Sequence, residues 1–190
     1  MTTTARPRPR ERLLRAAEEL FYNEGIHVGV DRLCSVAGVS KRSMYQHFGS
    51  KDEVVVEMLR ARAATLAAGW SGSEGLPPRE RILAIFDSVE KLSASPDFRG
   101  CPFVNAATEL KDRTHPASVA ALGYKLELNR FFEEQARSGG AIDPAPLGVQ
   151  LTMLFDGACA YSVVRGGSTH AARAAAEALL DAQGVRSTVA

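Results

Sequence analysis

The sequence has few cysteines, few histidines and no excess of charge of one sign. Its three cysteines form no CxxC pair, which excludes a disulfide-stapled fold and predicts free thiols in a reducing compartment. The four histidines are scattered, and none has a metal-site spacing such as HExxH. With 23 Lys and Arg against 22 Asp and Glu, the net charge of +1 identifies no partner. We therefore expect no metal and no cofactor.

Targeting and membrane signals are also missing. Residues 1–10, MTTTARPRPR, have no apolar core and do not resemble a signal peptide. The longest apolar stretch carries Gln150 and Asp156, and we expect it to be too short to cross a bilayer. The glycines of GWSGSEG follow a helical pattern rather than a strand, so they form no phosphate loop. The sequence thus predicts a cytoplasmic protein that is not an enzyme and does not contact a membrane.

Helical periodicity runs through the whole chain, and no segment alternates with period two. The first stripe is typical: Leu13, Ala17, Leu20 and Phe21 share one face. The fold class is all-α with about nine helices, expected at 10–23, 30–37, 41–48, 50–68, 78–95, 103–110, 116–138, 145–165 and 168–183. Composition divides the chain into a flexible basic arm (1–9), a helix-turn-helix domain (10–51), a connecting helix (52–68) and a second helical domain (69–190).

The two short helices around Gly38 have the spacing of a helix-turn-helix motif, with Ser40 as the cap of the second. Residues 38–51 hold several basic side chains and no acid. Arg or Lys can read guanine and Gln can read adenine, whereas Tyr, His and Lys suit phosphates. The candidate DNA contacts are Lys41, Arg42, Ser43, Tyr45, Gln46, His47 and Lys51. The same pattern also occurs in helical hairpins that contact proteins, so the residues alone leave both alternatives open.

Residues 10–60 resemble the N-terminal domain of the TetR family of bacterial transcriptional regulators. The resemblance depends on AGVSK (37–41), Tyr45 and HFGSK (47–51), and RGCPFVNAATEL (99–110) is similar to a segment of some members. It implies a homodimeric, ligand-responsive protein that binds a palindromic double-stranded DNA operator, usually as a repressor. It also implies that residues 41–43 face bases or backbone, and that Tyr45, His47 and Lys51 bind phosphates.

The helix expected at 145–165 is apolar on two faces, whereas a helix in a monomer usually buries one. One stripe holds residues 147, 151, 154, 158 and 161, and the other holds 149, 153, 157, 160 and 164. Two stripes indicate one face in the protein's own core and one against a second copy, although a fully buried central helix would show the same pattern. The expected dimer contacts are Leu151, Leu154, Ala158, Tyr161, Ala172 and Ala176.

Large apolar residues of the second domain are candidates for an effector pocket, although each also suits a core. They favour a small, mostly apolar molecule. The candidate lining residues are Trp70, Phe86, Phe103, Asn105, Tyr124, Phe131 and Phe155. A second hypothesis is a redox or electrophile sensor, because Cys101 lies at a helix start close to Arg99, where a thiol becomes more reactive.

Overall fold

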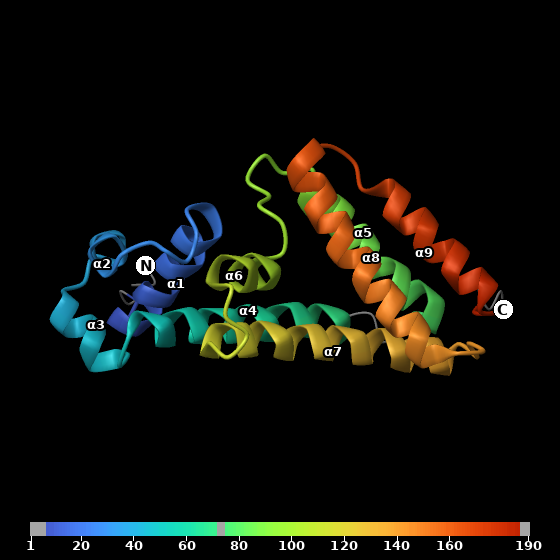
Figure 1. Ribbon diagram of the computed structural model, residues 1–190, viewed down its shortest axis with the longest axis horizontal. Helices are drawn as coiled ribbons and strands as arrows, with labels where there is room; N and C mark the ends of the chain where they lie inside the picture. The colour runs from blue at the N-terminus through green and yellow to red at the C-terminus, as the bar shows by residue number, and fades with distance from the viewer. Residues whose placement is uncertain (1–6, 72–74, 187–190) are drawn as a thin grey trace, which may run out of the picture.

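The computed structural model describes residues 7–71 and 75–186, and within these the regular structure is helical throughout (Figure 1). The helices are α1 (Pro9–Asn23), α2 (Val30–Ala37), α3 (Lys41–His47), α4 (Lys51–Ser71), α5 (Pro78–Ser93), α6 (Pro102–Leu110), α7 (Pro116–Ser138), α8 (Pro144–Arg165) and α9 (His170–Ala182). The all-α class and the approximate helix positions are therefore confirmed. Proline occupies the first turn of α1, α5, α6, α7 and α8, where its missing N–H breaks no helical bond.

Two expected boundaries differ from the structure. Helix α4 continues to Ser71, three residues beyond its expected end, and residues 72–74 of the expected loop lie outside the described residues. Residues 1–6 of the basic arm also lie outside them, and Pro9 already belongs to α1. Helix α4 runs without a break from Lys51 to Ser71 and so crosses the expected boundaries at 51/52 and 68/69. These domain boundaries remain a prediction.

The molecule is elongated, with α1, α2 and α3 at one end and α5, α8 and α9 at the other (Figure 1). Helices α4 and α7 lie side by side along its length and connect the two ends, and α6 lies between α1 and the far group. One continuous apolar core extends from Leu13 in α1 to Val185 beyond α9. Because the core is shared, a shift of one end has to be accommodated by the other.

Polar contacts fasten α1 and its following loop to the rest of the molecule. Arg10 of α1 forms an ion pair with Glu57 of α4. Arg62 of α4 lies 3.3 Å from Glu18 of α1. The Glu109 carboxylate of α6 accepts a hydrogen bond from the backbone N–H of Ile26 at 2.8 Å. The first helix is thus held to both α4 and α6.

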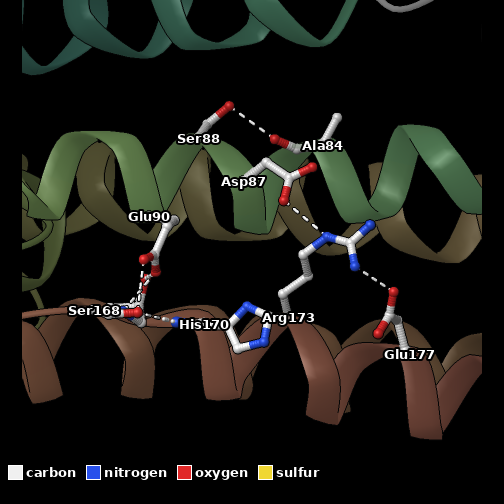
Figure 2. Close-up of polar contacts among 9 residues, drawn as sticks. Ala84, Asp87, Ser88, Glu90, Ser168, His170, Arg173 and Glu177 are labelled. Carbon is white, nitrogen blue, oxygen red and sulfur yellow. Dashed lines mark hydrogen bonds and ion pairs between the residues drawn. The ribbon is translucent and has the colours of Figure 1, made fainter.

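Helix α9 is held against α5 by a polar network (Figure 2). The Glu90 carboxylate accepts hydrogen bonds from Ser168 Oγ at 2.7 Å and from the Thr169 N–H at 2.6 Å, which caps the start of α9 from a neighbouring helix. One turn further along, Arg173 of α9 lies 2.8 Å from the Asp87 carboxylate. These contacts fix how α9 lies beside α5.

Helix α8 is 22 residues long and apolar enough, by length and composition alone, to cross a membrane. The expectation that this stretch is too short was therefore wrong. Its polar residue Asp156 forms an ion pair with Lys125 of α7, and its side chains Leu147 and Leu151 are fully buried against the core. We interpret α8 as a core helix of a helical bundle whose outer face is also apolar.

Candidate DNA-binding interface and effector cavity

The turn between α2 and α3 depends on Gly38, which has φ 62° and ψ 39°. A residue with a side chain rarely adopts this left-handed conformation. The following Ser40 accepts a hydrogen bond from the Ser43 N–H at 3.1 Å and so caps α3. Arg12 of α1 donates to the Gly38 carbonyl at 2.9 Å. The angle between the two short helices is therefore fixed by backbone conformation and by α1.

We expect Gly38→Ala to lower the free energy of unfolding by about 1–2 kcal/mol, because alanine is strained at positive φ. Its added Cβ would also lie 3.3 Å from Arg12 Nη1. Gly123→Ala is the control, since nothing lies within 4 Å of a Cβ at this helical glycine. It should leave stability unchanged or raise it. Urea unfolding of both variants measures the difference, and equal stabilities would contradict the strain at the turn.

Helix α3 has one buried side and one exposed side. Met44 and, just after the helix, Phe48 are buried at 0% and 1% exposure and anchor it to the core. The outward face carries the predicted side chains Lys41, Arg42, Tyr45, Gln46 and His47, all exposed. Ser43 is half-buried, and its N–H is used by the cap. A two-turn helix with such a face has the size and chemistry to enter a major groove.

Two of the predicted lysine contacts have protein partners. Lys51 Nζ donates to the carbonyls of Ile26 at 2.8 Å and Val28 at 3.3 Å, so it ties down the loop between α1 and α2. Two of the three ammonium donors are thus used within the protein, and the phosphate contact of Lys51 stays a prediction. Lys41 Nζ lies 2.6 Å from an Asp31 carboxylate oxygen, which raises the lysine pKa. Both groups are exposed, so this weak pair can open when an anion approaches.

A cavity of about 220 Å³ lies among the long helices. Helix α4 contributes Leu66 and Trp70 to its wall, and α7 and α8 contribute Tyr124 and Phe155. Helix α1 contributes Tyr22, whose hydroxyl donates to the Gly100 carbonyl at 3.1 Å and accepts from the Arg99 N–H at 2.9 Å. The cavity therefore touches the same helix that supports the helix-turn-helix.

The structure separates the predicted effector residues into two groups. Trp70, Tyr124 and Phe155 line the cavity. Phe86 and Phe131 are buried in the core and do not appear in the wall, and Phe103 lies behind Tyr124 with ring centroids 3.9 Å apart. Asn105 donates to the Arg99 carbonyl at 2.7 Å and lines an adjoining cavity instead. Sequence reasoning missed Tyr22, Arg62 and Arg81, because nothing local shows that residues so far apart in the chain share a wall.

Two thiols, Cys101 and Cys159, line the same cavity, and both are buried. Burial raises the pKa of Cys159 to about 12, with a smaller contribution from the neighbouring Cys101. The Arg99 guanidinium donates to the carbonyls of Pro96 and Phe98, so it is occupied away from the thiols. This arrangement suits small apolar wall residues better than an activated thiolate.

Three of the six predicted dimer residues of α8 and α9 are buried within their own chain. Leu151, Ala158 and Ala176 are buried in their own chain at 0%, 6% and 0% exposure, so they are not available to a second copy. Leu154 and Ala172 are half-buried, and only Tyr161 is exposed among the six. The other stripe of α8 and the outer side of α9 are exposed instead, at Val149, Met153, Gly157, Ala160, Val164, Ala171, Ala174, Ala175 and Ala178.

Comparison with known proteins agrees with this geometry. Residues 13–58 match the family of bacterial regulatory proteins, tetR family. A putative TetR transcriptional regulator from Streptomyces avermitilis (sav143) is 43% identical, with 95% of this chain and 100% of that chain covered and a TM-score of 0.88. The chain belongs to the TetR family. A TetR-family regulator from Streptomyces coelicolor, SCO4454, is 30% identical with 92% and 95% covered and a TM-score of 0.87.

A further relative is the HTH-type transcriptional activator FasR of Mycolicibacterium smegmatis, which is 43% identical over 61 residues. That match covers 32% of this chain and 28% of FasR, so the chain spans well under a third of that relative. TetR-family membership and fold are those of a DNA-binding transcriptional regulator. The exposed face of α3 is, within that fold, the candidate surface for DNA.

Proposed function

We propose that this TetR-family protein is a cytoplasmic repressor that binds a palindromic operator as a homodimer and is released by a small, mostly apolar molecule. The observation that carries the proposal is the position of Tyr22. This residue of α1 is part of the wall of the 220 Å³ cavity, while α1 also packs against α2 and α3. An occupant of the cavity therefore contacts a helix that sets the orientation of the DNA-binding face.

The route from the cavity to the helix-turn-helix is short. Tyr22 is hydrogen-bonded at Arg99 and Gly100, immediately before α6, so a change in the cavity's size moves α1 against α6. Helix α1 fixes the turn through the bond from Arg12 to Gly38. In one conformation of the dimer, the separation of the two recognition helices does not match the operator. A ligand that binds this conformation more tightly than the operator-binding conformation lowers operator affinity, to an extent set by the ratio of its two affinities.

Dimerisation through the exposed stripe of α8 and α9 would explain why the proposed operator is palindromic. The exposed stripe contains Met153 and Val164, whose exposed fractions are 68% and 83%. Because the α5–α9 network holds the helices in place, these apolar side chains would remain in water in a monomer, at a cost in free energy. Two copies joined across it would form a four-helix interface and present two α3 helices to successive turns of a duplex. The stripe and the palindrome are two parts of one proposal.

A substitution that fills the cavity tests the coupling. Ala84 of α5 lines the cavity and is half-buried, so Ala84→Trp should imitate a bound effector. We expect operator affinity, measured by fluorescence anisotropy on a duplex selected from random DNA, to fall about tenfold or more, the usual size of an allosteric coupling. Ala94→Trp, at an exposed position outside the cavity, should leave affinity unchanged. Unchanged or higher affinity in folded Ala84→Trp would contradict ligand-induced release.

The thiol-sensing alternative makes a different prediction. With Cys159 held protonated by its raised pKa and Cys101 buried, we expect both to resist mild peroxide in the native protein. Operator affinity should be the same before and after treatment, and the same in Cys101→Ser. Intact-protein mass spectrometry measures the modification. Oxidation of Cys101 accompanied by loss of DNA binding would favour the sensor and contradict the small-molecule proposal.

A further inference from the structure

A second hollow lies between α6 and α7, and we call it the α6–α7 cleft. It measures about 490 Å³, which falls within the range of about 300–1,000 Å³ that is usual for small-molecule sites. The Phe103 ring belongs to its wall and stacks on Tyr124, a residue of the 220 Å³ cavity, with the ring centroids 3.9 Å apart. One aromatic pair thus lies between the two hollows. The apolar wall of the cleft is formed by Phe103, Val104, Ala107, Ala121 and Leu122.

A buried hydroxyl without a partner belongs to this wall. Ser118 lies in the first turn of α7 and lines the cleft, and its Oγ has no hydrogen-bond partner within the described part of the chain. The residue is only 7% exposed, and an unpaired hydroxyl at such a position costs free energy. The start of a long helix also favours negative charge, because its first N–H groups lack helical partners. A ligand oxygen carrying negative charge would satisfy both features.

The turn that closes the cleft contains a lysine in an unfavourable backbone conformation. Lys111 ends α6 with φ 56° and ψ 14°, in the left-handed region that glycine adopts without strain. Among the described residues it is the one non-glycine with positive φ. A strained residue at the edge of a cleft indicates that its side chain has a use there. Lys111 lines the cleft together with Arg113, and we call these two residues the rim cations.

The other charged groups of the wall are engaged within the protein. Asp112 accepts hydrogen bonds from the Thr114 N–H at 2.8 Å and from its hydroxyl at 2.7 Å, which lowers the pKa of Asp112. Asp156 of α8 forms an ion pair with Lys125 of α7. Both rim cations are exposed, and neither forms an ion pair with a residue that the structure describes. With three bases and two acids the wall has a net charge of +1, and its unpaired positive charge lies beside the start of α7.

We propose that the α6–α7 cleft binds a small amphipathic anion, with its anionic head at Lys111, Arg113 and Ser118 and its hydrocarbon body between α6 and α7. This site is separate from the 220 Å³ cavity of the proposed function and does not rest on it. Ser118 and Lys125 line the two ends of α7's share of the wall, seven positions apart or about 10 Å along the axis, close to the length of an extended eight-carbon chain. Such a chain would cover Leu122, which is 57% exposed at the edge of the cleft.

Three ligands with the same chain and different heads test the chemistry. Octanoate, octanamide and octylamine are each titrated by calorimetry against the full-length protein, below the concentrations at which they form micelles. We expect octanoate to bind about tenfold or more tightly than octanamide, because charge-assisted hydrogen bonds are about twice as strong as neutral ones. Octylamine should bind most weakly, since its head carries the charge of the rim cations. Equal affinities of octanoate and octylamine would overturn the proposal.

Two filling variants assign the binding site. Ala107 of α6 is half-buried in the wall of the cleft, so Ala107→Trp should abolish octanoate binding. Ala84→Trp fills the 220 Å³ cavity instead and should bind octanoate like the wild type. Circular dichroism confirms that both variants are folded. If octanoate binds to Ala107→Trp as tightly as to the wild type, or if Ala84→Trp alone loses binding, the cleft is not the site.

Lys111→Gly separates binding from folding. Glycine relieves the left-handed strain, so the urea midpoint should rise, whereas octanoate affinity should fall about fivefold or more because a rim cation is lost. Arg130→Gln removes an exposed charge of α7 outside the wall and should change neither quantity. A purely structural role of Lys111 does not predict a more stable protein that binds less tightly. Higher stability with unchanged octanoate affinity would overturn the assignment of Lys111.

Ser118→Ala tests the other side of the proposed head site. The substitution deletes a hydroxyl that is already unpaired, so it should leave the urea midpoint unchanged or raise it. Octanoate affinity should fall several-fold, and octanamide affinity should change less, because the bond to a charged acceptor is the stronger one. Unchanged octanoate affinity in both Ser118→Ala and Lys111→Gly would overturn the position of the anionic head.

Discussion

Alanine at both Tyr45 and His47 is expected to lower operator affinity about a hundredfold. Both side chains are exposed on the outward face of α3 and donate to phosphates in the proposed complex. One charge-assisted hydrogen bond contributes about 1.5 kcal/mol, which is close to tenfold in affinity. The loss of two such bonds therefore lowers affinity about a hundredfold. Stability should hardly change, because the buried residues that anchor the helix are untouched.

The comparison is made by fluorescence anisotropy on one operator at fixed salt. His27→Ala is the control, since His27 is an exposed histidine with 80% of its side chain accessible, located in the loop before α2. It should bind like the wild type. An operator affinity of the double variant within threefold of wild type would remove α3 from the DNA interface and favour the hairpin as a protein-contact module.

Met153→Glu is expected to convert the dimer into a monomer and to weaken operator binding by about a hundredfold or more. Met153 lies at the middle of the exposed stripe of α8, so a dimer across that stripe would bury two unpaired carboxylates. A monomer also loses the gain of engaging two half-sites at once, which is commonly worth two to four orders of magnitude. Size-exclusion chromatography with light scattering measures the first effect, and anisotropy measures the second.

Leu122→Glu is the matched control for the interface. Leu122 is 57% exposed on α7 and lies outside the proposed stripe, so this variant should remain dimeric. If Leu122→Glu dissociates the protein and Met153→Glu does not, the interface lies over α7, and the assignment to α8 and α9 is contradicted. If neither variant changes the mass of the assembly, the exposed stripe is not where the copies meet.

The helices could be predicted closely because their ends are marked locally. Gly38 and Ser40 mark the turn between α2 and α3, and prolines at 102, 116 and 144 mark three later starts. Each signal acts within a few residues of itself, so it needs no knowledge of the tertiary fold. The exposed face of α3 was predictable for the same reason, since Met44 and Phe48 fix which side is buried.

The inward stripe of α8 could not be chosen from periodicity, because both stripes are apolar. One signal was present in Gly148, where a Cβ would lie 3.1 Å from the Asn129 carbonyl of α7. A glycine required by close helix approach marks the side of α8 that packs against its neighbour. The stripe on that side, with Leu147 and Leu151, is the buried one. The opposite, exposed stripe is therefore the one proposed as the dimer interface.

The remaining site residues are determined by contacts between distant parts of the chain. Lys51 is of a residue type that suits a phosphate contact, yet its ammonium group donates to the carbonyls of Ile26 and Val28, more than 20 residues earlier in the chain. Tyr22 and Arg62 belong to the cavity only because α1 and α4 cross beside α6. No local pattern contains this information, so the residues of the cavity wall could be identified only from the fold.

Selection from random duplex DNA tests the central claim most directly. Wild-type protein, refolded from denaturant to remove any bound ligand, and the Tyr45→Ala/His47→Ala variant are each selected at two salt concentrations. The account predicts that wild-type protein recovers one palindrome with half-sites about one helical turn apart, bound with steep salt dependence, and that the variant recovers none. Binding by the wild type without sequence preference, or recovery of the same palindrome by the variant, would contradict it.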